Sequence, residues 1–298
     1  MPEPKQTNVK RGNGFGFMFF NFVLRLVGLK HARRMAAIVC VYYLLFDWRA
    51  VKNTLPYVRH LLPEAGFFKR MTFTYRLFVN QAWMLLDRIA FNVGLISFEH
   101  TSEGYDTFVE LAENQPIGVI LLGAHFGNWQ LAVEGLKKLT CRVNIVMSPE
   151  TNPAVKKHLK INSATGNINY VFTDGPDHGC VEIAGALCAG EVVCLMGDRA
   201  YGSDTVQVEF LGEPAYFPFS AWAIAAKTGS AVIPFFVCKN PKTEYHVCSD
   251  TPVYPKIERR ASIAETIQPR VEKYVKQLET MILNYPEQCF IFSDVWKR

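Results

Sequence analysis

The sequence lacks the local signatures of several large enzyme classes. It has no Gly-x-x-x-x-Gly-Lys-Ser/Thr phosphate loop, no Gly-x-Gly-x-x-Gly dinucleotide fingerprint, no Gly-x-Ser-x-Gly elbow and no His-Glu-x-x-His motif. These absences argue against a nucleotide enzyme, a serine hydrolase of the usual α/β type and a zinc peptidase. We therefore predict no organic cofactor and no metal.

Paired cysteines, long apolar runs and strong charge are also missing. None of the eight cysteines forms a Cys-x-x-Cys pair, which predicts buried, reduced thiols of a cytosolic compartment rather than a disulfide or metal framework. The uncharged run Met35–Phe46 has only about twelve residues, whereas a spanning helix needs about twenty. A net charge of +5 does not by itself suggest nucleic acid as a partner.

The N-terminal part carries aromatic and basic residues instead. Residues 1–13 are polar and are predicted as a flexible tail, and residues 14–100 as a helical, membrane-interfacial region. Met35–Phe46 is compatible with an interfacial helix and equally with a core helix. Helical spacing continues over Lys52–Val93. The nearby positive charges fit an anionic membrane surface better than DNA: Arg25, Lys30, His31, Arg33 and Arg34.

The remainder, residues 101–298, alternates short apolar β-branched runs with helical segments. Strands that alternate with helices predict an α/β domain with a mostly parallel sheet covered by helices on both faces. The predicted strands are Ile117–Leu122, Val143–Met147, Tyr170–Phe172, Val192–Met196 and Ala231–Cys238. The predicted helices are Trp129–Leu139, Ala154–Ala164, Cys180–Ala189, Ala221–Thr228 and Ser262–Asn284.

One histidine stands where such a sheet binds its ligands. His125 follows the strand ending at Leu122, and open α/β sheets bind ligands beyond the carboxyl ends of their strands. Imidazole titrates near neutrality and can take a proton from a substrate, and amides at the start of the next helix can hold an oxyanion. A buried histidine satisfied by a backbone carbonyl is the alternative. The candidate substrate contacts in this turn are Phe126, Gly127, Asn128 (an N-cap or a side-chain donor) and Gln130.

A second polar pair follows another predicted strand. Asp198 and Arg199 come directly after Val192–Met196 and a glycine, and they suit either a capped turn or a site for an anionic group such as a phosphate. Farther along, the aromatic loop 208–220, which includes Phe217, is compatible with lining an acyl chain and equally with simple packing.

Several ordered blocks resemble one family. Gly123-Ala-His-Phe-Gly-Asn-Trp is similar to the histidine block of the lipid A late acyltransferases, within the lysophospholipid acyltransferase-like superfamily. Further blocks resemble the family in order: Ser148-Pro-Glu-Thr-Asn-Pro, Gly197-Asp-Arg-Ala-Tyr-Gly, Phe217-Pro-Phe-Ser, Val232-Ile-Pro and Tyr285-Pro-Glu-Gln. The resemblance implies that His125 acts as general base in acyl transfer from an acyl-carrier-protein or CoA thioester. The implied acceptor is a lipid-like hydroxyl or amine, at the cytoplasmic face of the inner membrane.

The chain departs from the family pattern at the acidic residue five positions after the histidine. Gln130 occupies that position, and replacing an acid by an amide in a serine protease triad costs about 10⁴-fold. Two routes could compensate for it. Another carboxylate, Glu150 or Asp198, could reach the ring of His125, or the acceptor could be a phenol or amine that needs less base assistance.

Two further departures concern charge. Ser148 replaces a family arginine, and 293–295 replaces a basic segment, so we expect an acceptor other than lipid A. Two alternatives to acyl transfer remain: a relative that binds lipid or acyl carrier protein without turnover, and a thioesterase in which His125 activates water.

Overall fold

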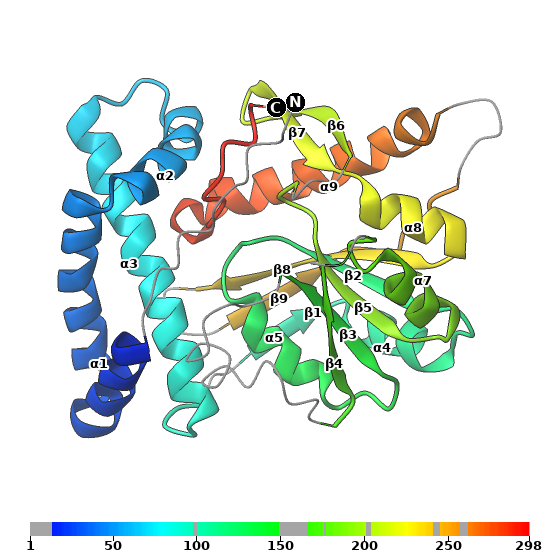
Figure 1. Cartoon of the computed structure of the whole chain (residues 1–298), viewed down its shortest axis with the longest axis horizontal. Coiled ribbons are helices and arrows are strands. Elements are labelled where there is room, and N and C mark those ends of the chain that lie inside the picture. Colours follow the sequence, from blue (N-terminus) through cyan, green and yellow to red (C-terminus); the bar gives the residue numbers. More distant parts are fainter. Residues whose placement is uncertain are drawn as a thin grey trace.

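Among the described residues, a seven-stranded sheet with helices on its faces lies beside three N-terminal helices (Figure 1). The computed structural model describes residues 14–97, 100–148, 166–173, 175, 177–200, 204–240, 245–256 and 262–297. The predicted tail 1–13 and the predicted helix Ala154–Ala164 lie outside these residues.

The three N-terminal helices stand side by side at one end of the molecule (Figure 1). They are α1 (Gly14–Phe46), α2 (Trp48–Leu61) and α3 (Phe67–Asn92). Gly28 interrupts α1 with φ 76°, which favours glycine. The segment predicted as helix over 52–93 forms two helices, and Pro63 lies in the break between them. Among the described helices, none combines the length and apolar character needed to cross a bilayer.

The sheet has the strand order β1-β9-β8-β2-β5-β3-β4 and is parallel except where β8 meets β9. The strands are β1 (His100–Glu103), β2 (Val119–Gly123), β3 (Val143–Met147), β4 (Ile168–Phe172), β5 (Val192–Met196), β8 (Ala231–Lys239) and β9 (Tyr245–Ser249). The helices of this part are α4 (Tyr105–Asn114), α5 (Trp129–Leu136), α7 (Cys180–Cys188), α8 (Ser220–Thr228), α9 (Ile263–Asn284) and the short η1 (Pro286–Gln288).

The predicted α/β class, with a mostly parallel sheet and helices on both faces, is confirmed. One core contains side chains of α7, α8 and α9, and the other contains side chains of α4 and α5. The central strand β2 is buried along its whole length, as expected for a strand covered on both faces.

Part of the region predicted as an aromatic loop is instead a hairpin. It comprises β6 (Thr205–Phe210) and β7 (Glu213–Pro218), whose antiparallel pairing closes at Leu211 and Gly212. Every second residue of β6 is buried from Val206 to Phe210, the period of a strand with one face on the core.

Candidate active site

The ends of two predicted strands meet in the middle of the sheet. β2 and β5 are parallel neighbours, with Gly123 opposite Met196, and the amide of Gly197 donates to the carbonyl of Gly123 at 2.9 Å. His125 follows one strand and Asp198 the other. The carboxyl edge of the sheet therefore brings the two side chains together.

His125 and Asp198 form a hydrogen-bonded pair. Nδ1 of the ring lies 2.9 Å and 3.0 Å from the two carboxylate oxygens. The Asp198 side chain is fully buried, whereas 27% of the His125 side chain is exposed. Burial would raise the pKa of Asp198, but attraction to His125, the hydrogen bond to its ring and the nearby Arg199 outweigh burial, so that this pKa lies below its ordinary value.

This geometry fixes how the ring carries its proton. An ionised carboxylate only accepts hydrogen bonds, so Nδ1 of His125 must donate to Asp198. In the neutral ring, Nε2 then holds the free lone pair. That nitrogen can take a proton from a bound group, and the buried carboxylate would stabilise the imidazolium that results.

The turn that carries His125 is held by the C-terminal segment. The carbonyl of His125 accepts from the amide of Phe290 at 2.7 Å, and the amide of Gly127 donates to the carbonyl of Gln288 at 2.8 Å. The amide of Phe126 donates to Ala124 at 2.7 Å. The amides of Phe126 and Gly127 are therefore engaged within the protein and do not serve as oxyanion donors in this conformation.

Gly127 is required by its backbone and its surroundings. Its φ is +59°, and a Cβ atom added there would lie 1.5 Å from the carbonyl oxygen of Val237 on β8. Gly127 therefore lies in close contact with a neighbouring strand of the protein itself. This contact holds the turn against β8 at a point two residues after His125.

Gln130 faces a different partner. Its Oε1 accepts a hydrogen bond from the guanidinium of Arg88 on α3. The side chain at position 130, where the family pattern has an acid, therefore contacts the cation Arg88. The described carboxylate at the His125 ring is Asp198, and the other predicted candidate, Glu150, lies outside the described residues.

The remaining predicted contacts lie in supporting positions. Phe126 and Phe217 are buried in the core, where Phe126 packs edge-to-face on Phe236.

Asn128 is the N-cap residue of α5, but its side chain does not cap the helix. Its side-chain amide donates instead to the carbonyl of Met84 at 3.0 Å and to the hydroxyl of Tyr245 at 3.3 Å. Arg199 donates to the carbonyl of Phe290, and its Nε lies 4.0 Å from Asp198.

Two groups that support the site, Tyr274 and Gln288, were not among the residues predicted from the sequence. The hydroxyl of Tyr274 on α9 donates to the carbonyl of Gly123 at 2.7 Å, and burial raises its pKa well above the ordinary value. Gln288 donates to the carbonyl of Lys239 and accepts from its amide, which joins the C-terminal segment to β8. The sequence signal for Gln288 was the family-like block Tyr285-Pro-Glu-Gln, to which it belongs.

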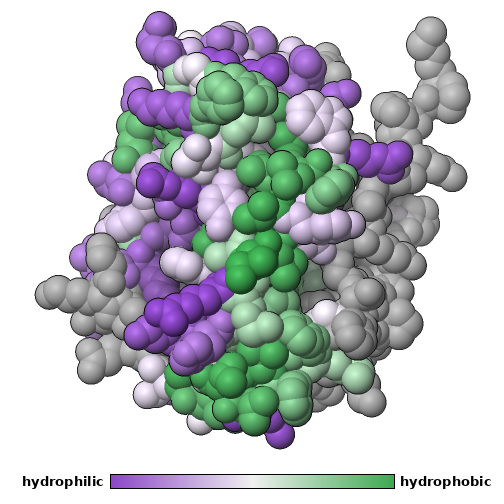
Figure 2. Space-filling model, turned by 90° about the vertical axis from the view of Figure 1, so that its left-hand side faces the viewer, coloured by the Kyte–Doolittle hydropathy of each residue, from purple (hydrophilic) through white to green (hydrophobic). Residues whose placement is uncertain are grey.

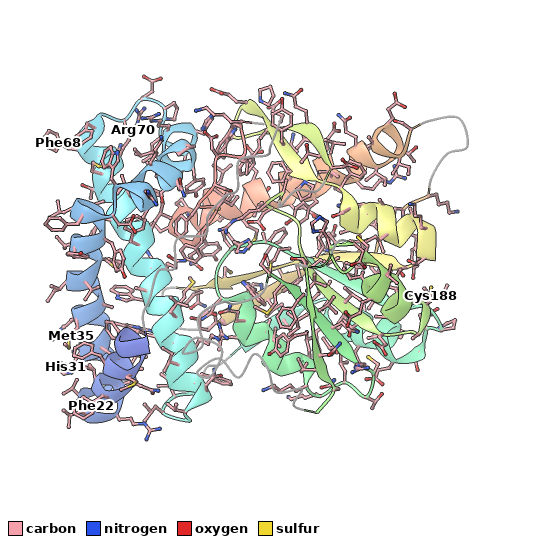
Figure 3. All side chains as sticks on the ribbon, viewed as in Figure 1. Phe22, His31, Met35, Phe68, Arg70 and Cys188 are labelled. Atoms are coloured by element: carbon pink, nitrogen blue, oxygen red, sulfur yellow. The ribbon has the colours of Figure 1, made fainter. Side chains whose placement is uncertain are left out.

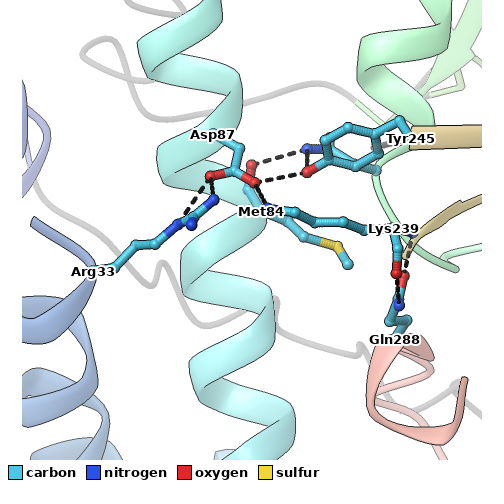
Figure 4. Close-up of polar contacts among 7 residues, drawn as sticks. Arg33, Met84, Asp87, Lys239, Tyr245 and Gln288 are labelled. Atoms are coloured by element: carbon cyan, nitrogen blue, oxygen red, sulfur yellow. Dashed lines mark hydrogen bonds and ion pairs between the residues drawn. The ribbon is translucent and has the colours of Figure 1, made fainter. Parts of the chain in front are cut away.

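A second buried carboxylate joins the N-terminal helices to the sheet (Figure 4). Asp87 on α3 is fully buried and accepts from Arg33 of α1, from Lys239 of β8 and, at 2.8 Å, from the hydroxyl of Tyr245 on β9. Burial lowers the pKa of Lys239, against the attraction of Asp87. Because Tyr245 also accepts from Asn128, this network reaches the helix that follows His125.

An apolar cavity of about 460 Å³ lies beside the candidate site. It lies between the sheet and helices α4 and α5, and Met196 and Phe235 of its wall also pack against Gly123. The volume falls in the range of small-molecule pockets, about 300–1,000 Å³. Its apolar wall includes Phe108, Leu121, Trp129, Leu136, Phe235 and Val247.

The pair itself offers no metal site. Within the part of the chain that the structure describes, no third His, Cys, Asp or Glu donor joins His125 and Asp198 at metal-ligand spacing. Fold and site together define an α/β protein with a histidine–carboxylate pair at the ends of adjacent parallel strands.

The comparisons place the chain more closely. The profile of the bacterial lipid A biosynthesis acyltransferases matches residues 72–298, and the chain belongs to this family of lipid acyltransferases. The resemblance expected from the sequence blocks is thereby confirmed.

Two individual proteins are also similar. Phosphatidylinositol mannoside acyltransferase of Mycobacterium tuberculosis is 26% identical over 121 residues, which are 40% of this chain and 38% of that relative's length. The crystal structure of the 1-acyl-sn-glycerophosphate acyltransferase PlsC from Thermotoga maritima superimposes with a TM-score of 0.42 at 16% identity. That match covers 84% of this chain and 98% of the other.

Proposed function

We propose that this protein transfers an acyl group from an acyl-carrier-protein or CoA thioester to a hydroxyl or amine of a lipid-like acceptor, with His125 as the general base. The observation that carries the proposal is the buried Asp198 carboxylate on Nδ1 of His125, in a member of an acyltransferase family. The neighbouring apolar cavity offers room for the acyl chain.

In the proposed reaction, Nε2 of His125 takes the proton of the acceptor as its oxygen or nitrogen attacks the thioester carbonyl carbon. Asp198 stabilises the imidazolium that forms. The tetrahedral intermediate then collapses, the carbon–sulfur bond breaks, and the imidazolium returns its proton to the leaving thiolate. The products are the acylated acceptor and the free thiol of the carrier.

The test follows a radiolabelled acyl thioester through the reaction with wild-type protein and His125→Ala. We expect labelled acceptor from the wild type and a loss of about 10⁴-fold in the variant, the upper end of general acid–base contributions. Labelled free fatty acid would indicate a thioesterase, and no turnover would indicate a binding protein. Either result, or an active His125→Ala variant, would overturn the proposal.

We further propose that α1 and the start of α3 dock this protein on the membrane that holds its acceptor. Large apolar side chains are exposed along these helices, and Phe22 and Phe68 lie at opposite ends of this face (Figure 3). Figure 2 shows hydrophobic side chains gathered along the face, with hydrophilic ones beside them. The exposed apolar residues include Phe22, Leu26, Ile38, Leu45, Phe67 and Phe68. Exposed basic residues lie between them, which suits anionic headgroups.

Sedimentation with vesicles checks this docking. Phe68→Glu is expected to reduce binding to anionic vesicles severalfold, because it places a charge on the most exposed ring of the face. Val181→Glu is the matched control, since Val181 is an exposed apolar residue of the distant α7. Equal losses in both variants would contradict the docking face.

The acceptor is proposed to differ from lipid A. Ser148 and the segment 293–295 lack the basic residues that the family pattern places there, and these would neutralise a phosphorylated disaccharide. Mass spectrometry of lipids from cells with and without this protein identifies the acceptor. A missing acyl chain on lipid A alone would contradict this part of the proposal.

A further inference from the structure

Three groups that bind metals in other proteins meet at the edge of the sheet, away from His125. Parallel pairing of β1 with β9 sets Glu103 opposite Cys248, and His246 precedes Cys248 by two residues on the same strand face. One donor atom each from Glu103, His246 and Cys248 lies within 4.8 Å of the others. Among the described residues, the ion-pair partner of the Glu103 carboxylate is His246.

Thr101 orients the imidazole of this cluster. Its Oγ1 lies 2.6 Å from Nδ1 of His246, and Nε2 of the same ring lies 3.5 Å from Oε1 of Glu103. In the tautomer that carries its proton on Nδ1 and donates it to Thr101, the lone pair of Nε2 is aimed at a carboxylate oxygen. Two electron-rich atoms attract each other only through a proton or a cation between them. Metal-binding histidines have this arrangement, with the second ring nitrogen held by an outer partner.

Although the sequence predicts no metal, we propose that Glu103, His246 and Cys248 bind one Zn²⁺ ion. Thiolate, imidazole and carboxylate are the ligands that zinc takes in proteins, and a thiolate and an imidazole together disfavour Mg²⁺ and Ca²⁺. Zinc–ligand distances of about 2.0–2.3 Å in a tetrahedron put the ligand atoms roughly 3.3–3.8 Å apart. The 3.5 Å between His246 and Glu103 already has this spacing.

A second thiol supports the sulfur ligand. Cys238 on β8 is hydrogen-bonded to Cys248. When Cys248 binds zinc as a thiolate, Cys238 can donate its hydrogen to the metal-bound sulfur.

The proposed zinc would stabilise one wall of the apolar cavity. β1 has four residues and pairs with β9 alone, so little else holds this edge strand in place. Glu103 itself lines the cavity, as do Ser102, Tyr245 and Val247 from the opposite face of the same two strands. A metal that joins Glu103 to the β9 ligands would fix the register of these strands. The role is structural and does not depend on the proposed acyl transfer.

Metal binding by the intact, chelator-stripped protein tests the proposal. Wild-type protein dialysed against Zn²⁺ should retain one zinc per chain, and Co²⁺ in its place should show a thiolate-to-cobalt charge-transfer band. Cys248→Ser should abolish the band and the retained zinc. Cys188→Ser is the control, because Cys188 is an exposed cysteine on α7, far from this edge (Figure 3).

A milder variant separates a metal ligand from a merely structural residue. Thr101→Val removes only the outer partner of His246 and should weaken zinc affinity about 10- to 100-fold, the usual cost of an outer-shell change. Circular dichroism confirms that each variant is folded. Wild-type protein that retains no zinc, or zinc retained equally by Cys248→Ser, would overturn the proposal whatever the acyltransferase assay shows.

Discussion

Two aspartates are completely buried among the described residues, Asp87 and Asp198, and their partners differ. Asp87 lies among two basic side chains and a hydroxyl donor: Arg33, Lys239 and Tyr245. Asp198 lies against the partly exposed imidazole of His125, whose second ring nitrogen can exchange a proton with a bound group. A buried carboxylate surrounded by basic groups can hold two parts of a fold together, whereas one paired with an accessible imidazole can support proton transfer. The same side chain thus serves stability in one place and chemistry in the other.

Of the changes at the two aspartates, Asp198→Asn should have the larger effect on the rate. We expect kcat to fall by about 10²- to 10⁴-fold with little change in KM, because an amide no longer stabilises the imidazolium or fixes the ring tautomer. Steady-state kinetics with the labelled thioester measures this loss.

The pH dependence of unfolding gives a control for this variant. The pKa of Asp198 lies below its ordinary value of 3.8 in the folded protein, so its charge stabilises the fold above about pH 4. This contribution is lost as pH falls through the folded-state pKa. The stability difference between wild type and Asp198→Asn should therefore narrow in acid, and a difference that grows there would contradict the pairing.

Asp87→Asn should instead affect stability. Removing one partner of a buried ion pair costs about 3–5 kcal/mol of unfolding free energy, since Arg33 and Lys239 would lose their counter-charge while mostly buried. Chemical denaturation measures the change. Activity per folded molecule should stay within severalfold of wild type. A variant that kept full stability and lost its activity would remove the contrast between the two aspartates.

Gln130→Glu should have the smallest effect. A carboxylate at this position would pair with Arg88, and a partly exposed ion pair contributes about 0–1 kcal/mol. Because Asp198 already holds the ring of His125, the rate should change no more than severalfold. A gain approaching 10⁴-fold in kcat would mean that Gln130 limits the rate and that Asp198 is not the carboxylate that assists His125.

The sequence predicts the two halves of the candidate site but not their meeting. His125 and Asp198 each follow an apolar strand run, and each is recognisable as a residue at a strand end. Their contact depends on β2 lying next to β5, although β3 and β4 come between them in the chain. Strand order is set by packing over the whole sheet, which no local pattern records.

Other residues show what residue type alone leaves open. Phe126 and Phe217 were candidates for substrate contact, but an aromatic side chain fits a core as well as a pocket, and both lie in the core. Val206, Val208 and Phe210 are buried at every second position, which is the period of a strand. The aromatic composition of this region had suggested a loop. Arg88 and Gln130 come from elements that meet only in the folded chain.

A double-mutant cycle tests the central claim, that Asp198 acts on catalysis through His125. Residues that act as one unit are strongly non-additive, so His125→Ala combined with Asp198→Asn should be no slower than His125→Ala alone. All three variants are compared in one assay of acyl transfer to the acceptor. If the two losses multiplied instead, Asp198 would act independently of His125, and the proposed pair would not be the catalytic unit.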